Sequence, residues 1–144
     1  ERMASFLGTP ALTAMTESDK SGAWPPSNIW LGVTAGNMRR ANERIPVLLG
    51  IGWERNFLSA EPLLEEMRLS PVWFWSVQQR RGLRWVITGP ENGPGARSTP
   101  AGAFESLRHQ CAYHGVPLWY KGNGGILEGH AHLKHPAELC YAPA

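Results

Sequence analysis

The sequence lacks most of the features that would assign it to a known functional class. Its 144 residues include two cysteines, Cys111 and Cys140, which lie far apart and form no C-x-x-C pair. This pattern argues against a disulfide scaffold and favours a reducing compartment. No apolar run approaches the ~20 residues that cross a bilayer. We therefore expect a cytoplasmic protein with no membrane partner.

Two further absences narrow the choice of ligand. The net charge of +2 is too small to indicate a nucleic-acid partner, because that class of protein neutralises many phosphates. The sequence contains no P-loop, and no G-x-G-x-x-G follows the first predicted strand, which weakens a dinucleotide-binding assignment.

The remaining composition is that of one soluble domain with flanking segments. Hydrophobic residues make up 42% of the chain and charged residues 18%. Residues 1–27 read as the end of a helix followed by a flexible loop rich in Thr, Ser, Pro and Gly. Residues 28–121 carry the regular apolar pattern of a folded domain. Residues 122–144 form a tail that bears glycine, histidine and proline.

Four short apolar runs in the central segment predict buried strands. They recur with a period of roughly 30 residues, the length of a right-handed βαβ unit. Strands covered on both faces are typical of parallel sheets. The sequence therefore predicts an α/β fold of parallel βα units, either an open doubly wound sheet or part of a (β/α) barrel. The predicted strands are residues 29–33, 56–60, 84–87 and 116–120.

Crossover helices are predicted between these strands. Asn37 opens a helix with apolar residues at spacings of three and four, which Pro46 should kink or restart. The segment 63–79 is ambiguous: its aromatic residues favour a strand by propensity, but a crossover helix fits the repeat better. Thr99 is the expected N-cap of a last helix, and Gly115 its C-terminal glycine.

Each predicted strand ends in polar or glycine-rich sequence. In parallel α/β proteins, ligands bind at the carboxyl ends of the strands. A charged loop residue is often only solvated, and a Gly/Pro run is often only a rigid turn. Because all four strands end in polar or glycine-rich sequence at the same edge, a small-molecule site is nevertheless favoured. Glycines there let the backbone approach a ligand closely. The two acids and two bases expected at this edge are Glu61, Glu91, Arg97 and Lys121.

Several segments together resemble the phage Gp37/Gp68 family, a domain of unknown function. They include Asn28-Ile-Trp-Leu-Gly-Val33, Leu58-Ser-Ala-Glu-Pro-Leu-Leu64 and Trp85-Val-Ile-Thr-Gly-Pro-Glu-Asn-Gly-Pro-Gly-Ala-Arg97. Gly115-Val-Pro-Leu-Trp-Tyr-Lys121 follows in the same order, and the similarity runs from about residue 28 to about 139.

The resemblance implies a radical-SAM-like partial barrel. Such proteins are expected to bind an iron–sulfur cluster through three N-terminal cysteines, together with S-adenosylmethionine. The positions that match the family and carry over as ligand-binding residues are Glu61, Glu91, Asn92, Arg97 and Lys121. The two glutamates would take a ligand amine or hydroxyl, Arg97 a carboxylate or phosphate, and Lys121 a second anion. No catalytic residue is assigned.

This sequence also departs from the family pattern. Gly89-Pro90-Glu91 stands where the family tends to have Gly-Gly-Glu, and Pro90 has no N–H with which to contact a ligand. Gly36 replaces an acid near the end of the first strand. After Lys121, the usual Gln-Trp becomes Gly122-Asn123.

The cysteine triplet is missing, so the chain is expected to correspond to the C-terminal half of such an enzyme, with the N-terminal half as its partner. Alone it should hold no cluster and perform no radical chemistry. The competing interpretation is a non-catalytic α/β binding or assembly module. His130, His132 and His135 are spaced so that they could bind zinc or nickel, but no convincing carboxylate or thiolate accompanies them. No metal site is assigned.

Overall fold

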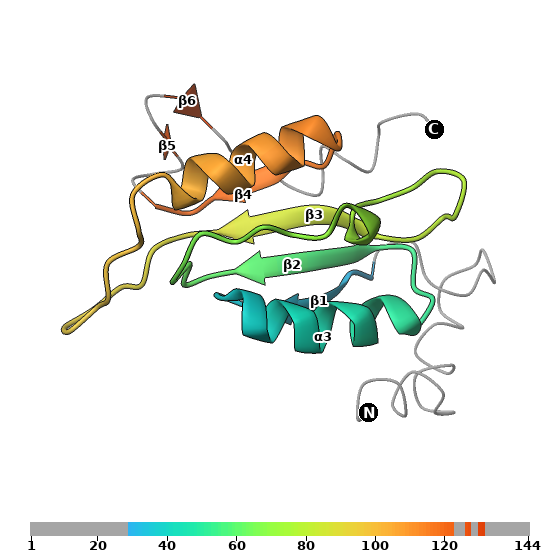
Figure 1. The fold of residues 1–144 in the computed structure, drawn as a ribbon, viewed down its shortest axis with the longest axis horizontal. Coiled ribbons are helices and arrows are strands. Elements are labelled where there is room, and N and C mark those ends of the chain that lie inside the picture. Colours follow the sequence, from blue (N-terminus) through green and yellow to red (C-terminus); the bar gives the residue numbers. More distant parts are fainter. Residues whose placement is uncertain (1–28, 123–125, 128–129, 132–144) are drawn as a thin grey trace. The chain divides into compact units, whose positions relative to one another are not determined.

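The computed structural model describes residues 29–122, 126–127 and 130–131. The chain divides into two units, Glu1–Trp30 and Leu31–Ala144, and the helices and strands described below belong to the second unit. Its main sheet has four parallel strands in the order β1-β2-β3-β4 (Figure 1). The predicted parallel α/β fold is confirmed. The strands are β1 (Leu31–Thr34), β2 (Asn56–Ala60), β3 (Leu83–Thr88) and β4 (Leu118–Tyr120).

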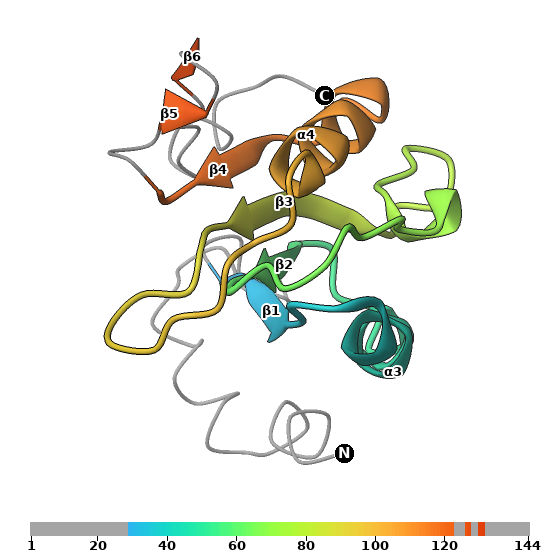
Figure 2. The same cartoon turned by 60° about the vertical axis from the view of Figure 1, so that its left-hand side comes forward.

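The strands follow one another across the sheet in chain order. Helix α3 (Met38–Gly50) connects β1 to β2, and α4 (Ala103–Tyr113) connects β3 to β4. Both helices lie on the same side of the sheet (Figures 1 and 2). A doubly wound sheet would reverse its strand order and place helices on both faces, so this topology favours the barrel alternative. Closure of a barrel stays a prediction, because β1 and β4 form the two edges of the sheet among the described residues.

The core lies between the sheet and the two helices. Leu58 and Val86 are register partners on neighbouring strands, and both are fully buried. The spacing of apolar residues in the helices turns one face of each helix toward these strands. Each such side chain contributes roughly 1.5–3 kcal/mol by leaving water. The helix residues buried in this core are Ala41, Ile45, Leu48, Leu49, Ala103, Leu107 and Cys111.

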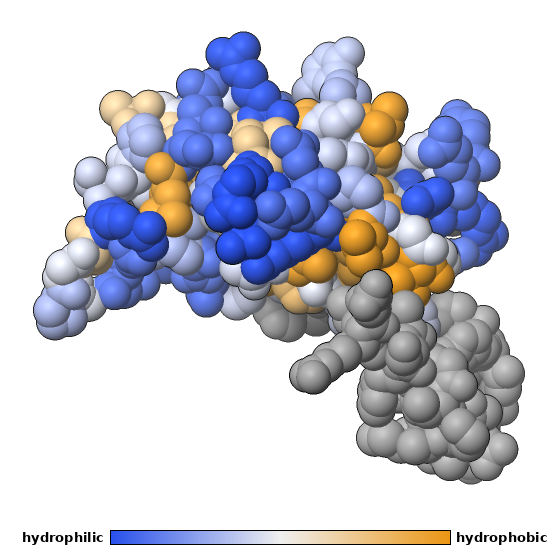
Figure 3. Space-filling view, turned by 60° about the horizontal axis from the view of Figure 1, so that its bottom comes forward, coloured by the Kyte–Doolittle hydropathy of each residue, from blue (hydrophilic) through white to orange (hydrophobic). Residues whose placement is uncertain are grey.

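Helix α3 begins as predicted and is continuous from Met38 to Gly50. The side chain of Asn37 accepts a hydrogen bond from the backbone N–H of Arg40 at 2.9 Å, which caps the helix. Pro46 does not restart the helix, since α3 runs through this residue. Pro46 is exposed, so the carbonyl that loses its partner can bond to water. The outward face of α3 is hydrophilic, as Figure 3 shows for this side of the molecule.

The predicted crossover helix in residues 63–79 is wrong. The chain instead runs without an α-helix to a single 3-10 turn, η1 (Pro71–Trp73), and then bridges back on itself between Ser76 and Arg81. Gln110 of α4 holds this connection, because its side-chain amide donates to the carbonyl of Met67 and accepts from the N–H of Leu69, each at 2.8 Å. These side-chain bonds replace those that a helix would have made internally.

The start of α4 also differs from its prediction. The helix begins at Ala103 after Gly102, whose φ of 77° lies in the left-handed region. Thr99 is therefore not the N-cap. Gly115 follows the helix with a φ of 65°, as expected of a C-terminal glycine. None of the described helices is long and apolar enough to cross a membrane.

Some predictions fall on residues that the structure does not describe. They are the helix end and loop of residues 1–27 and the side chains of the histidine cluster at 130, 132 and 135. Within the predicted tail 122–144, two short strands, β5 (Ile126–Leu127) and β6 (His130–Ala131), pair antiparallel.

Candidate functional site

The carboxyl ends of the four parallel strands lie at one edge of the sheet, where the arrowheads point in Figure 1. Glu61 directly follows β2, Gly89 directly follows β3, and Lys121 directly follows β4. The backbone N–H of Lys121 donates to the carbonyl of Thr88 at 2.8 Å, which extends the β3–β4 ladder by one bond. The strands themselves therefore fix the positions of these three residues.

Glu61 and Lys121 form an ion pair across the end of β3. The Nζ atom of Lys121 lies 2.9 Å from Oε2 of Glu61. The glutamate side chain is 20% exposed and the lysine side chain 45% exposed. The pair is therefore partly shielded from water and still open to a ligand.

Gly89 forms the floor beneath this ion pair. A Cβ atom at this position would lie 3.1 Å from Oε1 of Glu61 and 3.4 Å from Cβ of Lys121. The first distance is tighter than ordinary van der Waals contact, so a side chain here would press on the glutamate carboxylate. A glycine lets both charged side chains meet directly above the backbone.

Backbone contacts connect the loops that follow β1, β2 and β3. The N–H of Leu64 donates to the carbonyl of Gly36, and the N–H of Leu63 donates to the carbonyl of Gly89, both at 2.9 Å. The Thr99 hydroxyl donates to the carbonyl of Leu63 at 2.7 Å. The segment after β2, which begins with a cis peptide bond between Glu61 and Pro62, is thus held from both sides. Such fixation preorganises a site because little order must be gained on binding.

The contacts of this segment were not predicted from the sequence. Gly36 has almost no free space, since a Cβ there would lie 2.0 Å from the carbonyl oxygen of Pro62. The Glu65 carboxylate accepts a hydrogen bond from the N–H of Met38 at 2.5 Å and so contacts the first turn of α3. The glycine at position 36 was the only local signal of this close approach.

Glu91 and Arg97 form a second ion pair, within the loop from residue 89 to residue 102. The Arg97 side chain donates to both carboxylate oxygens, from Nε at 2.8 Å and from a terminal nitrogen at 2.6 Å. Its backbone N–H adds a third bond at 2.7 Å. The hydrogen bonds from Arg97 lower the pKa of Glu91 to about 2. This loop extends beyond the strand ends in Figure 1.

The predicted site residues therefore form two separate pairs. Glu61 contacts Lys121, and Glu91 contacts Arg97, but no hydrogen bond or ion pair joins the two pairs within the described part of the chain. Both carboxylate oxygens of Glu91 already accept hydrogen bonds from Arg97. This pair is therefore better suited to stabilising the loop that contains it than to binding a ligand. The predicted residue Asn92 is exposed in the same loop.

The described residues do not fit an iron–sulfur cluster. They include one cysteine, Cys111, which is buried on α4, and burial raises the pKa of its thiol to about 12. A cluster requires several thiolates brought together. Among the residues that the structure describes, no group of three or more His, Cys, Asp and Glu side chains is arranged to hold a metal ion.

Comparison with known proteins identifies the family but not an activity. Residues 1–138 match a family described as a protein of unknown function, DUF5131, and the chain belongs to this family. The match includes the N-terminal segment that the resemblance from the sequence had left out. Neither the curated proteins nor the solved structures contain a match.

Proposed function

We propose that this member of the DUF5131 family binds a small zwitterionic ligand at the carboxyl edge of its sheet, and that S-adenosylmethionine is this ligand. The observation that carries the proposal is the Glu61–Lys121 ion pair above Gly89. Its two charges come from different strands and are held at the place where parallel α/β proteins bind their ligands.

The chemistry of the ion pair suits an α-amino acid group. A ligand ammonium can replace Lys121 at the Glu61 carboxylate, while the ligand carboxylate takes the freed lysine. One ion pair within the protein is thereby replaced by two between the protein and the ligand. Partly exposed ion pairs contribute only about 0.2–1 kcal/mol, so the pair opens at little cost when a ligand offers two new partners.

We further propose that this sheet is one segment of a radical-SAM-like (β/α) barrel of the phage Gp37/Gp68 type, with the ligand site at its carboxyl edge. The consecutive strand order, with both helices on one side, is that of a barrel segment. In this proposal, further βα units from an N-terminal half of the protein complete the barrel and supply the cluster. The described residues contribute ligand contacts only.

A non-catalytic binding module is the second candidate. The observation that favours it is that the described residues supply an ion pair suited to binding and, with Cys111 alone, no set of thiolates for a cluster. Such a module would keep the ligand site and lack the redox chemistry.

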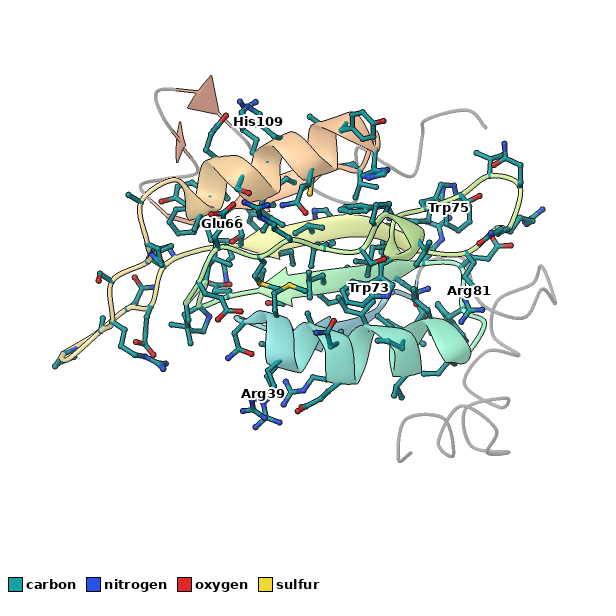
Figure 4. All side chains as sticks on the ribbon, in the orientation of Figure 1. Arg39, Glu66, Trp73, Trp75, Arg81 and His109 are labelled. Atoms are coloured by element: carbon teal, nitrogen blue, oxygen red, sulfur yellow. The ribbon has the colours of Figure 1, made fainter. Side chains whose placement is uncertain are left out.

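The test of the proposal is calorimetric titration of the chain with S-adenosylmethionine. The wild-type chain should bind, and both Lys121→Ala and Glu61→Gln should weaken binding at least tenfold, because each leaves one ligand charge without a partner. Arg39→Ala is the matched control, since Arg39 pairs with Glu43 on α3 and points away from the sheet in Figure 4. Absence of binding, or equal affinities for all four proteins, would overturn the proposal.

A second measurement separates the two candidates. Reductive cleavage of S-adenosylmethionine by this chain together with its proposed N-terminal half supports the enzyme. Binding without cleavage supports the module.

A further inference from the structure

The sheet has a second face, turned away from the helices, that carries a different set of side chains. Leu58, Val86 and Leu118 are register partners that face the helices. Because side chains alternate along a strand, their neighbours point to the opposite face. Two rows of this face follow from the strand register. The row nearer the amino ends is Gly32, Phe57 and Trp85, and the next row is Thr34, Ser59, Ile87 and Trp119.

Continuing the same alternation by two residues leads to the candidate site. Glu61 follows Ser59 on β2, Gly89 follows Ile87 on β3, and Lys121 follows Trp119 on β4. The Glu61–Lys121 ion pair is therefore the third row of this face. Two residues along a strand advance by about 6.6 Å, so the backbone of Trp119 lies one such step before Lys121 on β4.

Aromatic rings form a continuous wall on the second face. Phe57 and Trp85 have ring centroids 5.6 Å apart, and Trp85 and Trp119 are stacked with centroids 5.8 Å apart and an angle of 12° between their planes. Gly32 makes room for the first of these rings, because a Cβ there would lie 2.3 Å from the Phe57 ring. The outer two rings, Phe57 and Trp119, are only half-buried.

We infer that this aromatic wall (Phe57, Trp85 and Trp119) binds the planar ring of a nucleoside whose charged side chain meets Glu61 and Lys121. The inference rests on the proposed function and names the ligand class of the same site. Flat aromatic side chains bind nucleobases by stacking, which tolerates any base because every base has a π-face. The wall and the ion pair are adjacent on one face, so one molecule with a ring and a zwitterionic group can contact both.

Three probes separate the two parts of the site: S-adenosylmethionine carries the ring and the charged group, adenosine carries the ring alone, and methionine carries the charged group alone. Binding is measured by calorimetric titration of the full chain. We expect Trp119→Leu to weaken S-adenosylmethionine and adenosine about tenfold and to leave methionine unchanged. Lys121→Ala should weaken S-adenosylmethionine and methionine and leave adenosine unchanged.

Control variants distinguish stacking from damage to the fold. Trp119→Tyr keeps a flat ring and should retain most of the affinity for adenosine. Trp75→Leu is the matched tryptophan control, since Trp75 stacks under the Arg84 guanidinium at 4.3 Å and lies at the other end of the sheet (Figure 4). If Trp119→Leu does not fold, wild-type binding of adenosine and its retention in Trp119→Tyr still test the wall.

The outcomes distinguish failure of the inference from failure of the proposed function. If methionine and S-adenosylmethionine bind with equal affinity and adenosine does not bind, the charged site stands and the aromatic wall has no part in binding. If adenosine binds but Lys121→Ala changes no affinity, the wall stands and the proposed role of the ion pair is wrong. If none of the probes binds, both are wrong.

Discussion

Glu61 and Lys121 are separated by 60 residues in the sequence, and their side chains meet at 2.9 Å across the end of β3. The parallel register of β2, β3 and β4 produces this contact, because each of the two residues is the first after its strand. The register of the sheet thus brings the two charges together, and both lie at the edge where we propose that a ligand binds.

The ion pair should matter for binding far more than for stability. We expect Lys121→Ala to lower the free energy of unfolding by less than about 1 kcal/mol, as is usual for partly exposed pairs. Urea denaturation measures this change, and Arg39→Ala on α3 provides the comparison for an exposed pair. A loss above about 2 kcal/mol would show that the pair is a structural element of the sheet edge.

Gly36 should be the least tolerant glycine of the site loops. In Gly36→Ala, the new Cβ would lie 2.0 Å from the carbonyl oxygen of Pro62, a backbone atom that cannot move alone. We expect a loss of about 1–3 kcal/mol of unfolding free energy, the usual cost of overpacking, and weaker ligand binding because the segment that holds Glu61 shifts.

The control for this substitution is Gly50→Ala at the end of α3. A Cβ there has no neighbouring atom within 4 Å. Because alanine is a better helix former than glycine, stability should be unchanged or rise by up to about 1 kcal/mol. If both variants lose equal stability, close packing at Gly36 is not the cause.

Glu91 should make the loop of residues 89–102 sensitive to acid. The hydrogen bonds from Arg97 lower the pKa of Glu91 from its ordinary value of 4.5 to about 2. A carboxyl group with a depressed pKa in the folded state stabilises that state above its unfolded pKa. This contribution is complete above about pH 5 and is lost as the pH falls toward about 2.

Carbon NMR of the side-chain carboxyl group measures this titration directly. The Glu91 midpoint should lie near pH 2 in the wild-type chain and move up toward 4.5 in Arg97→Ala. Arg39→Ala should leave it unchanged, because Arg39 pairs with Glu43 instead. A midpoint near 4.5 in the wild-type chain would mean that the pair does not form in solution.

The sheet was predicted well because buried parallel strands appear in the sequence as short apolar runs. The run Asn56–Ala60 is a strand with the predicted bounds, and Glu61 and Lys121 directly follow β2 and β4 at the carboxyl edge of the sheet. Asn37 was recognisable as a helix cap because its amide bonds only three residues along the chain. These features depend on local sequence or on a repeat, and both are visible without coordinates.

The connection from β2 to β3 could not be predicted, because distant partners determine it. Gln110 of α4 bonds to Met67 and Leu69, more than 40 residues earlier, and Thr99 bonds to Leu63 instead of capping a helix. No local pattern records such contacts. The division of the four charged residues into two pairs could not be predicted for two different reasons. The sheet register brings together Glu61 and Lys121, which are distant in the sequence, and the conformation of the loop determines that Glu91 contacts Arg97.

Cys111 should resist thiol reagents as long as α4 stays packed on the sheet. Burial raises the pKa of its thiol from 9.0 to about 12, so the reactive thiolate is about a thousandfold rarer at a given pH than in the unfolded chain. In a Cys140→Ser variant, whose only thiol is Cys111, the reaction with Ellman's reagent at pH 8 should be at least a hundredfold slower in buffer than in denaturing urea. The rate in buffer should rise with urea concentration in step with unfolding, because opening of α4 is then required for reaction. Equal rates in buffer and urea would place Cys111 at the surface, and a thiolate accessible there would reopen the question of whether this helix contributes a metal ligand.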